Sequence, residues 1–168
     1  KKNPIKEKVS GSDLFPRVCK LAADKGYKVF LLGAAEGIAA RAAENLRSKY
    51  NGLNIVGTYS PSYGFEKKED EIEKIIEMIN EVKPDILAVG LGAPKQEKFL
   101  YKYRKKLNVP VSLAIGASID FEAGNMNRAP KWMQNIGLEW LYRLYQEPGR
   151  MARRYLIDDI KIIKLLFK

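Results

Sequence analysis

The sequence contains no histidine and only one cysteine, Cys19, among its 168 residues. Without histidine, the chain cannot carry a Ser-His-Asp or Cys-His mechanism, nor a histidine-ligated metal site. Acid–base chemistry must therefore fall to Asp, Glu, Lys or Tyr. A lone cysteine cannot form an internal disulfide, which fits a reducing, cytoplasmic setting.

Long apolar runs are also missing. None is long enough to span a bilayer, and no secretory signal is visible. There is no D-x-D motif of the kind that holds a metal–diphosphate complex, so we expect neither a metal nor a cofactor. The charge of a leaving group would then be neutralised by helix N-termini and by Arg or Lys. The chain opens at Lys1 and enters an organised segment almost at once, so we expect it to be a fragment that lacks an upstream segment.

Positive charge is present in excess. There are 30 Lys and Arg residues against 20 Asp and Glu, which gives a formal net charge of +10. This balance predicts an anionic partner: nucleic acid, anionic lipid or a phosphorylated substrate. The length and the 46% content of hydrophobic residues predict one domain with a proper core.

Apolar runs of strand length alternate with segments of helical periodicity. We expect strands at 28–33, 53–59, 85–89 and 111–116, and helices at 14–25, 38–50, 69–82, 97–107, 130–147 and 150–168. This alternation predicts an α/β fold with a Rossmann-like, mainly parallel sheet flanked by helices. We expect a nucleotide-sugar-binding core at 1–147 and a basic helical appendage at 148–168.

The segment 90–97, Gly-Leu-Gly-Ala-Pro-Lys-Gln-Glu, is the most informative motif. It follows an expected buried strand, and Pro94 stands where a helix should begin. Glycines let a ligand approach the backbone, and the free N–H groups of a first helical turn favour negative charge. A plain helix start explains Pro94 and Glu97, but not two glycines beside Lys95 and Gln96. The segment therefore predicts a phosphate-binding turn.

The other strand ends carry weaker signals. The turn that begins at Gly33 resembles a nucleotide-binding turn but lacks full G-x-G-x-x-G spacing, and its glycine could serve packing alone. Tyr59 and Ser60, rather than an acidic residue, end the second expected strand. Gly116 and Asp120 follow the fourth strand, where Asp120 could bind a sugar hydroxyl or a base edge, or merely cap a local turn.

The last segment concentrates basic residues on one side. With about 100° per residue, one narrow helical face holds Arg150, Arg153, Arg154, Lys161, Lys164 and Lys168. Apolar residues fall mostly opposite, as in a helix that lies on an anionic membrane surface. We therefore predict membrane contact by Arg154, Lys161, Lys164 and Lys168. The alternative is an ordinary C-terminal helix packed on its domain with its charges in solvent.

Four motifs together resemble those of the WecG/TagA/CpsF family of bacterial glycosyltransferases. They lie at 90–97, at 116–121 with Gly124, at 128–133 (Arg-Ala-Pro-Lys-Trp-Met), and at 137–144 with Glu147 and Pro148. The resemblance runs from about Lys8 to about Leu156. It is greatest to the TagA branch, the N-acetylmannosaminyltransferases of wall teichoic acid synthesis.

The resemblance implies an inverting, metal-independent transfer of N-acetylmannosamine from UDP to N-acetylglucosamine on undecaprenyl diphosphate. The enzyme would be peripheral at the inner face of the bacterial cell membrane. On this basis we predict UDP-sugar binding by Gly33, Tyr59, Gly92, Lys95, Gln96, Gly116 and Asp120. Stabilisation of the leaving group or of the acceptor phosphate would fall to Gln96, Arg143, Arg150 and Arg153. The family's base lies in a segment upstream of Lys1, and Lys8 stands where the family often has arginine.

Other functions fit parts of the sequence. A basic nucleic-acid- or membrane-binding module without catalysis would share the charge, but it gives no reason for the turn at 94–97. We therefore expect no nucleic-acid partner. A dinucleotide-dependent oxidoreductase is disfavoured by the incomplete glycine fingerprint. An inactive scaffold, a homo-oligomer and the exact donor sugar stay open, as does whether the last helix docks on lipid, on its own domain or on a neighbour.

Overall fold

The computed structural model describes residues 9–149 of the chain. The chain forms two compact units, Lys1–Met126 and Asn127–Lys168, each described below by itself. The expected helix at 150–168 lies outside the described residues. So do Lys8 and the predicted functional residues Arg150, Arg153, Arg154, Lys161, Lys164 and Lys168. The boundary predicted at 147/148 stays a prediction, although the described residues after Met126 group with the second unit.

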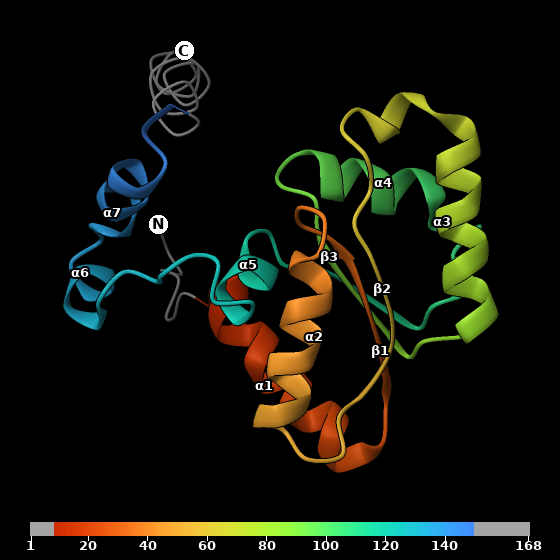
Figure 1. Ribbon diagram of the computed structural model, residues 1–168, viewed down its shortest axis with the longest axis horizontal. Helices are drawn as coiled ribbons and strands as arrows, with labels where there is room; N and C mark the ends of the chain where they lie inside the picture. Colours follow the sequence, from red (N-terminus) through yellow and green to blue (C-terminus); the bar gives the residue numbers. More distant parts are fainter. Residues whose placement is uncertain (1–8, 150–168) are drawn as a thin grey trace, which may run out of the picture. The chain divides into compact units, whose positions relative to one another are not determined.

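The first unit is built on a four-stranded sheet whose pairs are all parallel (Figure 1). The strands are β1 (Lys28–Gly33), β2 (Asn54–Tyr59), β3 (Ile86–Gly90) and β4 (Val111–Ala114), in the order β2-β1-β3-β4. All four expected strands are present within one or two residues of their predicted bounds. The predicted α/β fold with a parallel sheet is therefore confirmed.

Helices cover both faces of this sheet. They are α1 (Gly11–Lys25), α2 (Ile38–Lys49), the short 3-10 helix η1 (Phe65–Lys67), α3 (Glu69–Val82), α4 (Lys95–Tyr103) and α5 (Ser118–Glu122). Helices α1, α2 and α5 lie on one face, and α3 and α4 on the other (Figure 1). The handedness of the crossovers explains this arrangement. A right-handed crossover lies on one face of the sheet when the chain moves one way along it, as from β1 to β2, and on the other face when the chain moves back, as from β2 to β3 and from β3 to β4.

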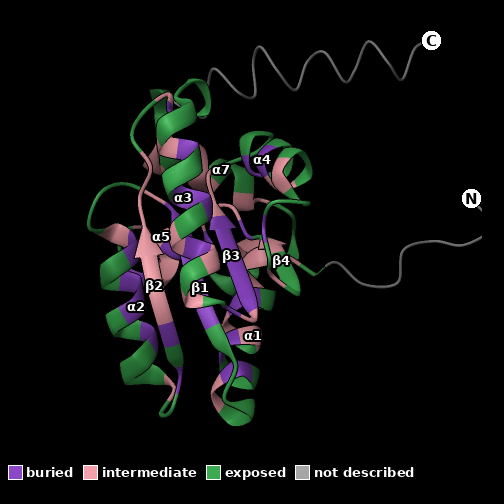
Figure 2. Cartoon of the chain, turned by 90° about the vertical axis from the view of Figure 1, so that its right-hand side faces the viewer, coloured by how far each residue is buried: buried purple, intermediate pink, exposed green. Residues whose placement is uncertain are grey.

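Side chains alternate along the two central strands and fill two separate cores. Val29 and Leu31 pack toward α1 and α2, whereas Phe30 and Leu32 pack toward α3 and α4. Figure 2 shows β3 buried, as expected for a strand covered on both faces. Helix α3 presents an apolar face to the second of these cores, and this face consists of Ile72, Ile75, Ile76 and Ile79.

Several elements differ from expectation. Helix α4 begins two residues earlier than predicted and ends at Tyr103. The segment after Gly116, where no helix was predicted, forms α5, and η1 was not predicted either. The expected single helix at 130–147 is wrong: the second unit has α6 (Lys131–Asn135) and α7 (Glu139–Gln146). Gly137 lies between them at φ 77°, a left-handed conformation that interrupts a right-handed helix.

No helix within residues 9–149 is long and apolar enough to cross a membrane. In the second unit, α6 and α7 leave large apolar side chains exposed. These are Trp132, Ile136, Trp140, Leu141 and Tyr145.

The carboxyl ends of the central strands touch through bare backbone. A Cβ atom on Gly33 would lie 2.4 Å from the carbonyl oxygen of Gly90, and one on Gly90 would lie 2.7 Å from the carbonyl oxygen of Gly116. The amide of Ala34 donates to the Gly90 oxygen at 3.1 Å. Glycine at 33 and 90 is thus required by packing, because any side chain would separate these segments.

We predict that Gly33→Ala destabilises the fold by about 2 kcal/mol or more, because the methyl group overlaps backbone at a φ of 124°. Chemical denaturation measures the loss. The matched control is Gly149→Ala, whose Cβ meets nothing within 4 Å and whose φ is not positive, and whose stability should stay within about 0.5 kcal/mol. Equal stability of the two variants would contradict the packing requirement.

Candidate functional site

The candidate site is the edge of the sheet where all four parallel strands end. Strand β1 leads by way of α2 to β2 on one side, and β3 leads by way of α4 to β4 on the other. The chain therefore departs in opposite directions from two adjacent strand ends, which is where ligands bind in open α/β folds. Gly33, Gly92, Gln96 and Gly116 lie at or just beyond this edge.

Two glycines at this edge expose their backbone rather than pack it. Gly92 has φ 79° and Gly116 has φ 57°, and a Cβ on either would meet nothing within 4 Å. Gly92 accepts the amide hydrogen of Gln96 at 3.1 Å, so its turn leads directly into α4. The peptide bond between Ala93 and Pro94 is cis, and Pro94 caps α4 rather than standing in its first turn. The turn thus combines open backbone with a helix start, which suits an anion.

Gln96 joins the turn after β3 to the turn after β4. Its side chain is buried, its Oε1 accepts the amide hydrogen of Gly116 at 3.1 Å, and its Nε2 donates to Glu97 Oε1 at 2.8 Å. A buried amide with both ends bonded fixes the position of its partners. The structure therefore places Gln96 at the predicted location, with its amide engaged by protein groups.

Lys95 points from the same turn toward η1. Its Nζ lies 3.0 Å from Glu66 Oε1 and 5.6 Å from the centre of the Tyr63 ring. The Glu66 pKa lies below its ordinary value because a backbone N–H, and then Lys95, donate hydrogen bonds to it. Lys95 is therefore a cation at the edge of the site whose charge is shared with a neighbouring carboxylate.

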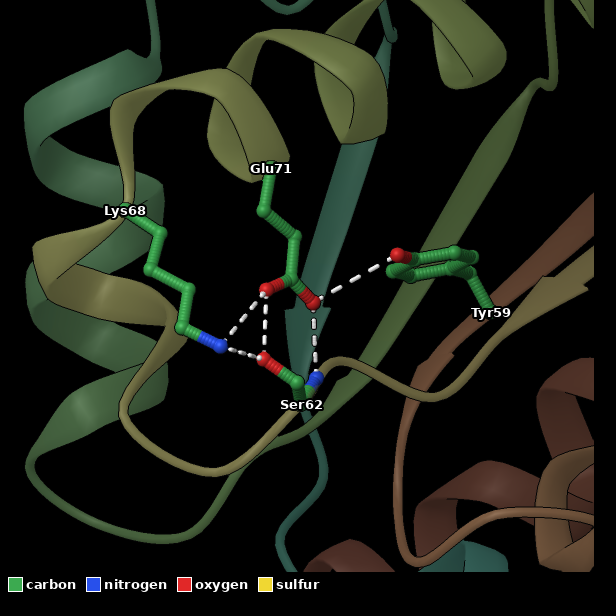
Figure 3. Close-up of polar contacts among 4 residues, drawn as sticks. All are labelled: Tyr59, Ser62, Lys68 and Glu71. Carbon is green, nitrogen blue, oxygen red and sulfur yellow. Dashed lines mark hydrogen bonds and ion pairs between the residues drawn. The ribbon is translucent and has the colours of Figure 1, made fainter.

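Tyr59, at the end of β2, is held by a carboxylate that anchors the following loop (Figure 3). Glu71 accepts from the Ser62 amide at 2.7 Å, from the Ser62 hydroxyl at 2.5 Å and from the Tyr59 hydroxyl at 3.4 Å, with Lys68 Nζ at 3.8 Å. These donors lower the Glu71 pKa, Ser62 contributing most. The pKa of Tyr59 is raised by burial and by the charge of Glu71. A carboxylate from α3 thus fixes the loop after β2.

The remaining predicted residues lie further along the chain. Asp120 lies within α5, where its carboxylate accepts from Asn125 Nδ2 at 3.3 Å. Arg143 lies in α7 of the second unit, 3.9 Å from Glu139 across one helical turn. The structure therefore brings Gly33, Gln96 and Gly116 together at the strand ends. Arg143 is placed only within the second unit.

Two groups at the edge were missed by sequence reasoning. Ser60 donates from its hydroxyl to the carbonyl oxygens of Gly33 and Ala35 at 3.2 and 3.0 Å, tying the end of β2 to the turn after β1. Glu71 is one of three acids in the first turn of α3, which is a common pattern at a helix N-terminus. It differs from the other two by its hydrogen bonds to Ser62 in the loop after β2, and no sequence pattern indicates that contact. Within residues 9–149 no cluster of three or more Cys, Asp or Glu residues could hold a metal ion.

A parallel α/β fold whose chain departs in opposite directions from two adjacent strand ends is typical of proteins that bind a ligand at that edge. The chain belongs to the WecG/TagA/CpsF family of glycosyl transferases, whose family model matches residues 1–168. The family predicted from the sequence motifs is therefore confirmed.

Two curated relatives share the same description, N-acetylglucosaminyldiphosphoundecaprenol N-acetyl-beta-D-mannosaminyltransferase. The protein of Bacillus subtilis (strain 168) is 34% identical over 97% of this chain and 61% of its own length. The protein of Bacillus spizizenii (strain W23) is 35% identical over 89% of this chain and 56% of its own length. The chain thus spans less than two thirds of the relatives it matches.

We predict that Glu71→Gln lowers stability at neutral pH by about 1 kcal/mol, because the hydrogen bonds to a charged acceptor are weakened. The folded-state pKa of Glu71 lies below its ordinary value of 4.5, so its stabilisation is present above pH 4.5 and is lost as the pH falls through the folded-state pKa. The difference between wild type and variant should therefore shrink from pH 7 to pH 3 in urea denaturation.

The control for this measurement is Glu77→Gln, an exposed acid on the same helix. It should change stability by less than about 0.5 kcal/mol at either pH. A difference between wild type and Glu71→Gln that stays constant from pH 7 to pH 3 would show that the carboxylate charge does not hold the loop.

Proposed function

We propose that this chain carries the nucleotide-sugar-binding core of an inverting glycosyltransferase. The reaction moves N-acetylmannosamine from UDP to N-acetylglucosamine on undecaprenyl diphosphate, in teichoic acid linkage-unit synthesis. Family membership and the descriptions of the two relatives support the reaction class, the donor sugar and the acceptor. The glycine-lined strand edge supports a site for the diphosphate of the donor.

One observation carries the proposal: the open, left-handed turn at Gly92, which leads directly into α4. Its backbone is free to approach a ligand because nothing fills the space beside the glycine. The start of α4 adds partial positive charge, and Lys95 adds a full one at the rim. Both favour the diphosphate, whose negative charge grows as the bond to the sugar breaks.

The other residues divide into positioning and charge-stabilising roles. Gln96 holds the turn at Gly116 against the start of α4, so it positions the opening rather than only contacting phosphate. Gly33 allows the ends of β1 and β3 to lie close together. Tyr59 and Asp120 would contact the nucleoside half of the ligand. Arg143, together with Arg150 and Arg153, would neutralise departing UDP or the acceptor diphosphate, which makes a metal unnecessary.

The acceptor hydroxyl needs a general base, and we propose that this base lies outside the chain. The carboxylates described near the strand edge already accept hydrogen bonds from protein groups. Glu71 accepts from Ser62, and Glu97 accepts from Gln96. A general base must lie within hydrogen-bond reach of the proton that it removes. Because Glu71 and Glu97 already accept hydrogen bonds from protein groups, we propose that another carboxylate, outside this chain, removes the proton.

We predict that Gly92→Ala weakens UDP binding at least tenfold, because its methyl group enters the space a phosphate would occupy, and a tenfold loss corresponds to about 1.4 kcal/mol. The matched control is Gly26→Ala. Gly26 has a similar φ of 70° and equally open surroundings, but it lies at the end of α1, before β1 begins. Both variants carry the same left-handed strain, so calorimetric titration with UDP separates strain from ligand contact.

The same pair tests turnover in a chain that spans the full length of the relatives. UDP release from UDP-N-acetylmannosamine with the lipid-linked acceptor should fall for Gly92→Ala and persist for Gly26→Ala. Similar UDP affinity in both variants would refute the proposed phosphate turn. UDP binding without acceptor-dependent release in the unaltered full-length chain would refute the transfer reaction instead.

We further propose that the protein acts at the inner face of the membrane, held through the basic face of residues 150–168. The exposed Trp132 and Trp140 of the second unit support this, since tryptophan is enriched at membrane–water interfaces. No nucleic acid is then needed to account for the net charge.

For membrane attachment we predict that Lys161→Gln/Lys164→Gln lowers binding to phosphatidylglycerol-containing vesicles by roughly thirtyfold, since each lysine near an anionic surface contributes about fivefold. Lys20→Gln/Lys25→Gln removes the same charge from the exposed side of α1 and serves as the control. Vesicle co-sedimentation measures both. Equal loss in the two double variants would mean that net charge alone, not the C-terminal face, drives binding.

A further inference from the structure

A cavity lies between η1, the start of α3 and one side of α4, and its lining reaches Pro94 and Lys95 beside the glycine turn. It has a volume of about 250 Å³. Its walls include Phe65, Ile72 and Phe99, and its rim carries Lys95, Lys98 and Lys102. Phe65 and Phe99 are themselves packed against each other with ring centres 6.0 Å apart. The cavity is therefore an apolar hollow under a row of cations.

The three lysines form a stripe along one helix. At about 100° per residue they fall within roughly 60° of one another on α4, beside the buried Phe99. No acid lies within ion-pair distance of Lys98 among the described residues, and Lys102 Nζ lies 5.0 Å from the centre of the adjacent Tyr103 ring. Lysine stems cover apolar surface while the charged ends stay at the rim.

Other charges around the rim leave it positive. Glu66 pairs with Lys95 at 3.0 Å, and Glu69 is close enough to act on the charge of Lys102. Against these two acids, the chain continues past Lys102 with Arg104, Lys105 and Lys106, all exposed. Helix α4 and its following turn thus carry a basic surface of which the proposed nucleotide-sugar site uses only Lys95.

Exposed tyrosines flank the same surface. Tyr63 beside η1 is 98% exposed, and Tyr101 on α4 is 71% exposed. A tyrosine that is apolar along its ring and polar at its tip is typical of the boundary between lipid and water. A soluble phosphate ester would require neither the apolar walls nor these rings, whereas a lipid would contact both.

We propose that this cavity is a headgroup site for an anionic phospholipid. The phosphate lies among Lys98, Lys102 and Lys95, and the first acyl carbons enter the hollow lined by Phe65, Ile72 and Phe99. The site would hold the first unit against a membrane surface independently of residues 150–168. It shares only Lys95 with the diphosphate turn of the proposed function.

The test uses short-chain lipids below the concentration at which they form micelles, so that the probe is a single molecule. The full chain is titrated by calorimetry with dihexanoyl phosphatidylglycerol, with dihexanoyl phosphatidylcholine, which has no net charge, and with glycerol phosphate, which has no acyl chain. We expect measurable binding of the first. Phosphatidylcholine should bind at least about fivefold more weakly, which is the contribution of one cationic contact. Glycerol phosphate should also bind at least about fivefold more weakly, because it has no acyl carbons to fill the hollow.

Three variants locate the binding. Lys98→Gln/Lys102→Gln should weaken it by roughly thirtyfold, at about fivefold per lysine, and Glu66→Gln should strengthen it by removing a competing carboxylate. Lys20→Gln/Lys25→Gln, on α1, should leave the affinity unchanged. All the altered side chains are exposed, so the melting temperatures should match wild type.

Several results would overturn the proposal. Unchanged phosphatidylglycerol affinity in Lys98→Gln/Lys102→Gln would show that the lipid does not bind at this cavity. Glycerol phosphate binding as tightly as the lipid would assign the lysines to a soluble phosphate ester. Single-stranded RNA that displaces the lipid and binds more tightly through the same lysines would assign the surface to nucleic acid.

Discussion

Direct backbone contact between the ends of the central strands is the constraint on which the candidate site depends. Gly33 and Gly90 allow three chain segments to approach without a side chain between them, since a Cβ on either would meet the backbone of Gly90 or of Gly116. The approach brings the turns after β1, β3 and β4 together at one edge of the sheet, where α4 begins. If the strand ends lay further apart, the same residue types would stand on the same strands. The start of α4 and the open glycines would then be too far apart to contact a single ligand.

The loops around this edge are held by side chains that donate to or accept from backbone. Gln96 bonds to Gly116, Ser60 to Gly33, and Glu71 to Ser62. Each bond links a loop to a neighbouring strand end or helix, so the loops do not depend on the bound ligand for their position. Such preorganisation reduces the entropy lost on binding and is worth more at a charged ligand than at a neutral one.

The sequence predicted the elements whose patterns are strictly local. Four isoleucines at helical spacing defined α3, and short apolar runs defined all four strands. It failed where a single backbone conformation decides the outcome, because Gly137 in a left-handed conformation splits a segment whose apolar spacing alone indicates one helix. At the site, the glycine turn before α4 could be predicted from the sequence, and its binding of phosphate stays a prediction. The packing role of Gly90 and the loop contact of Glu71 could not, because both depend on residues that meet only after folding.

The alternation of side chains along β1 has a consequence for how this family can diverge. Val29 and Leu31 belong to one core and Phe30 and Leu32 to the other, with only the sheet backbone between them. A change of volume on one face reaches the other only by moving a strand, so the energetic effects of substitutions on the two faces should be nearly additive. The two layers of helices can therefore accumulate changes separately, while the glycines at the strand ends, which serve both layers at once, cannot.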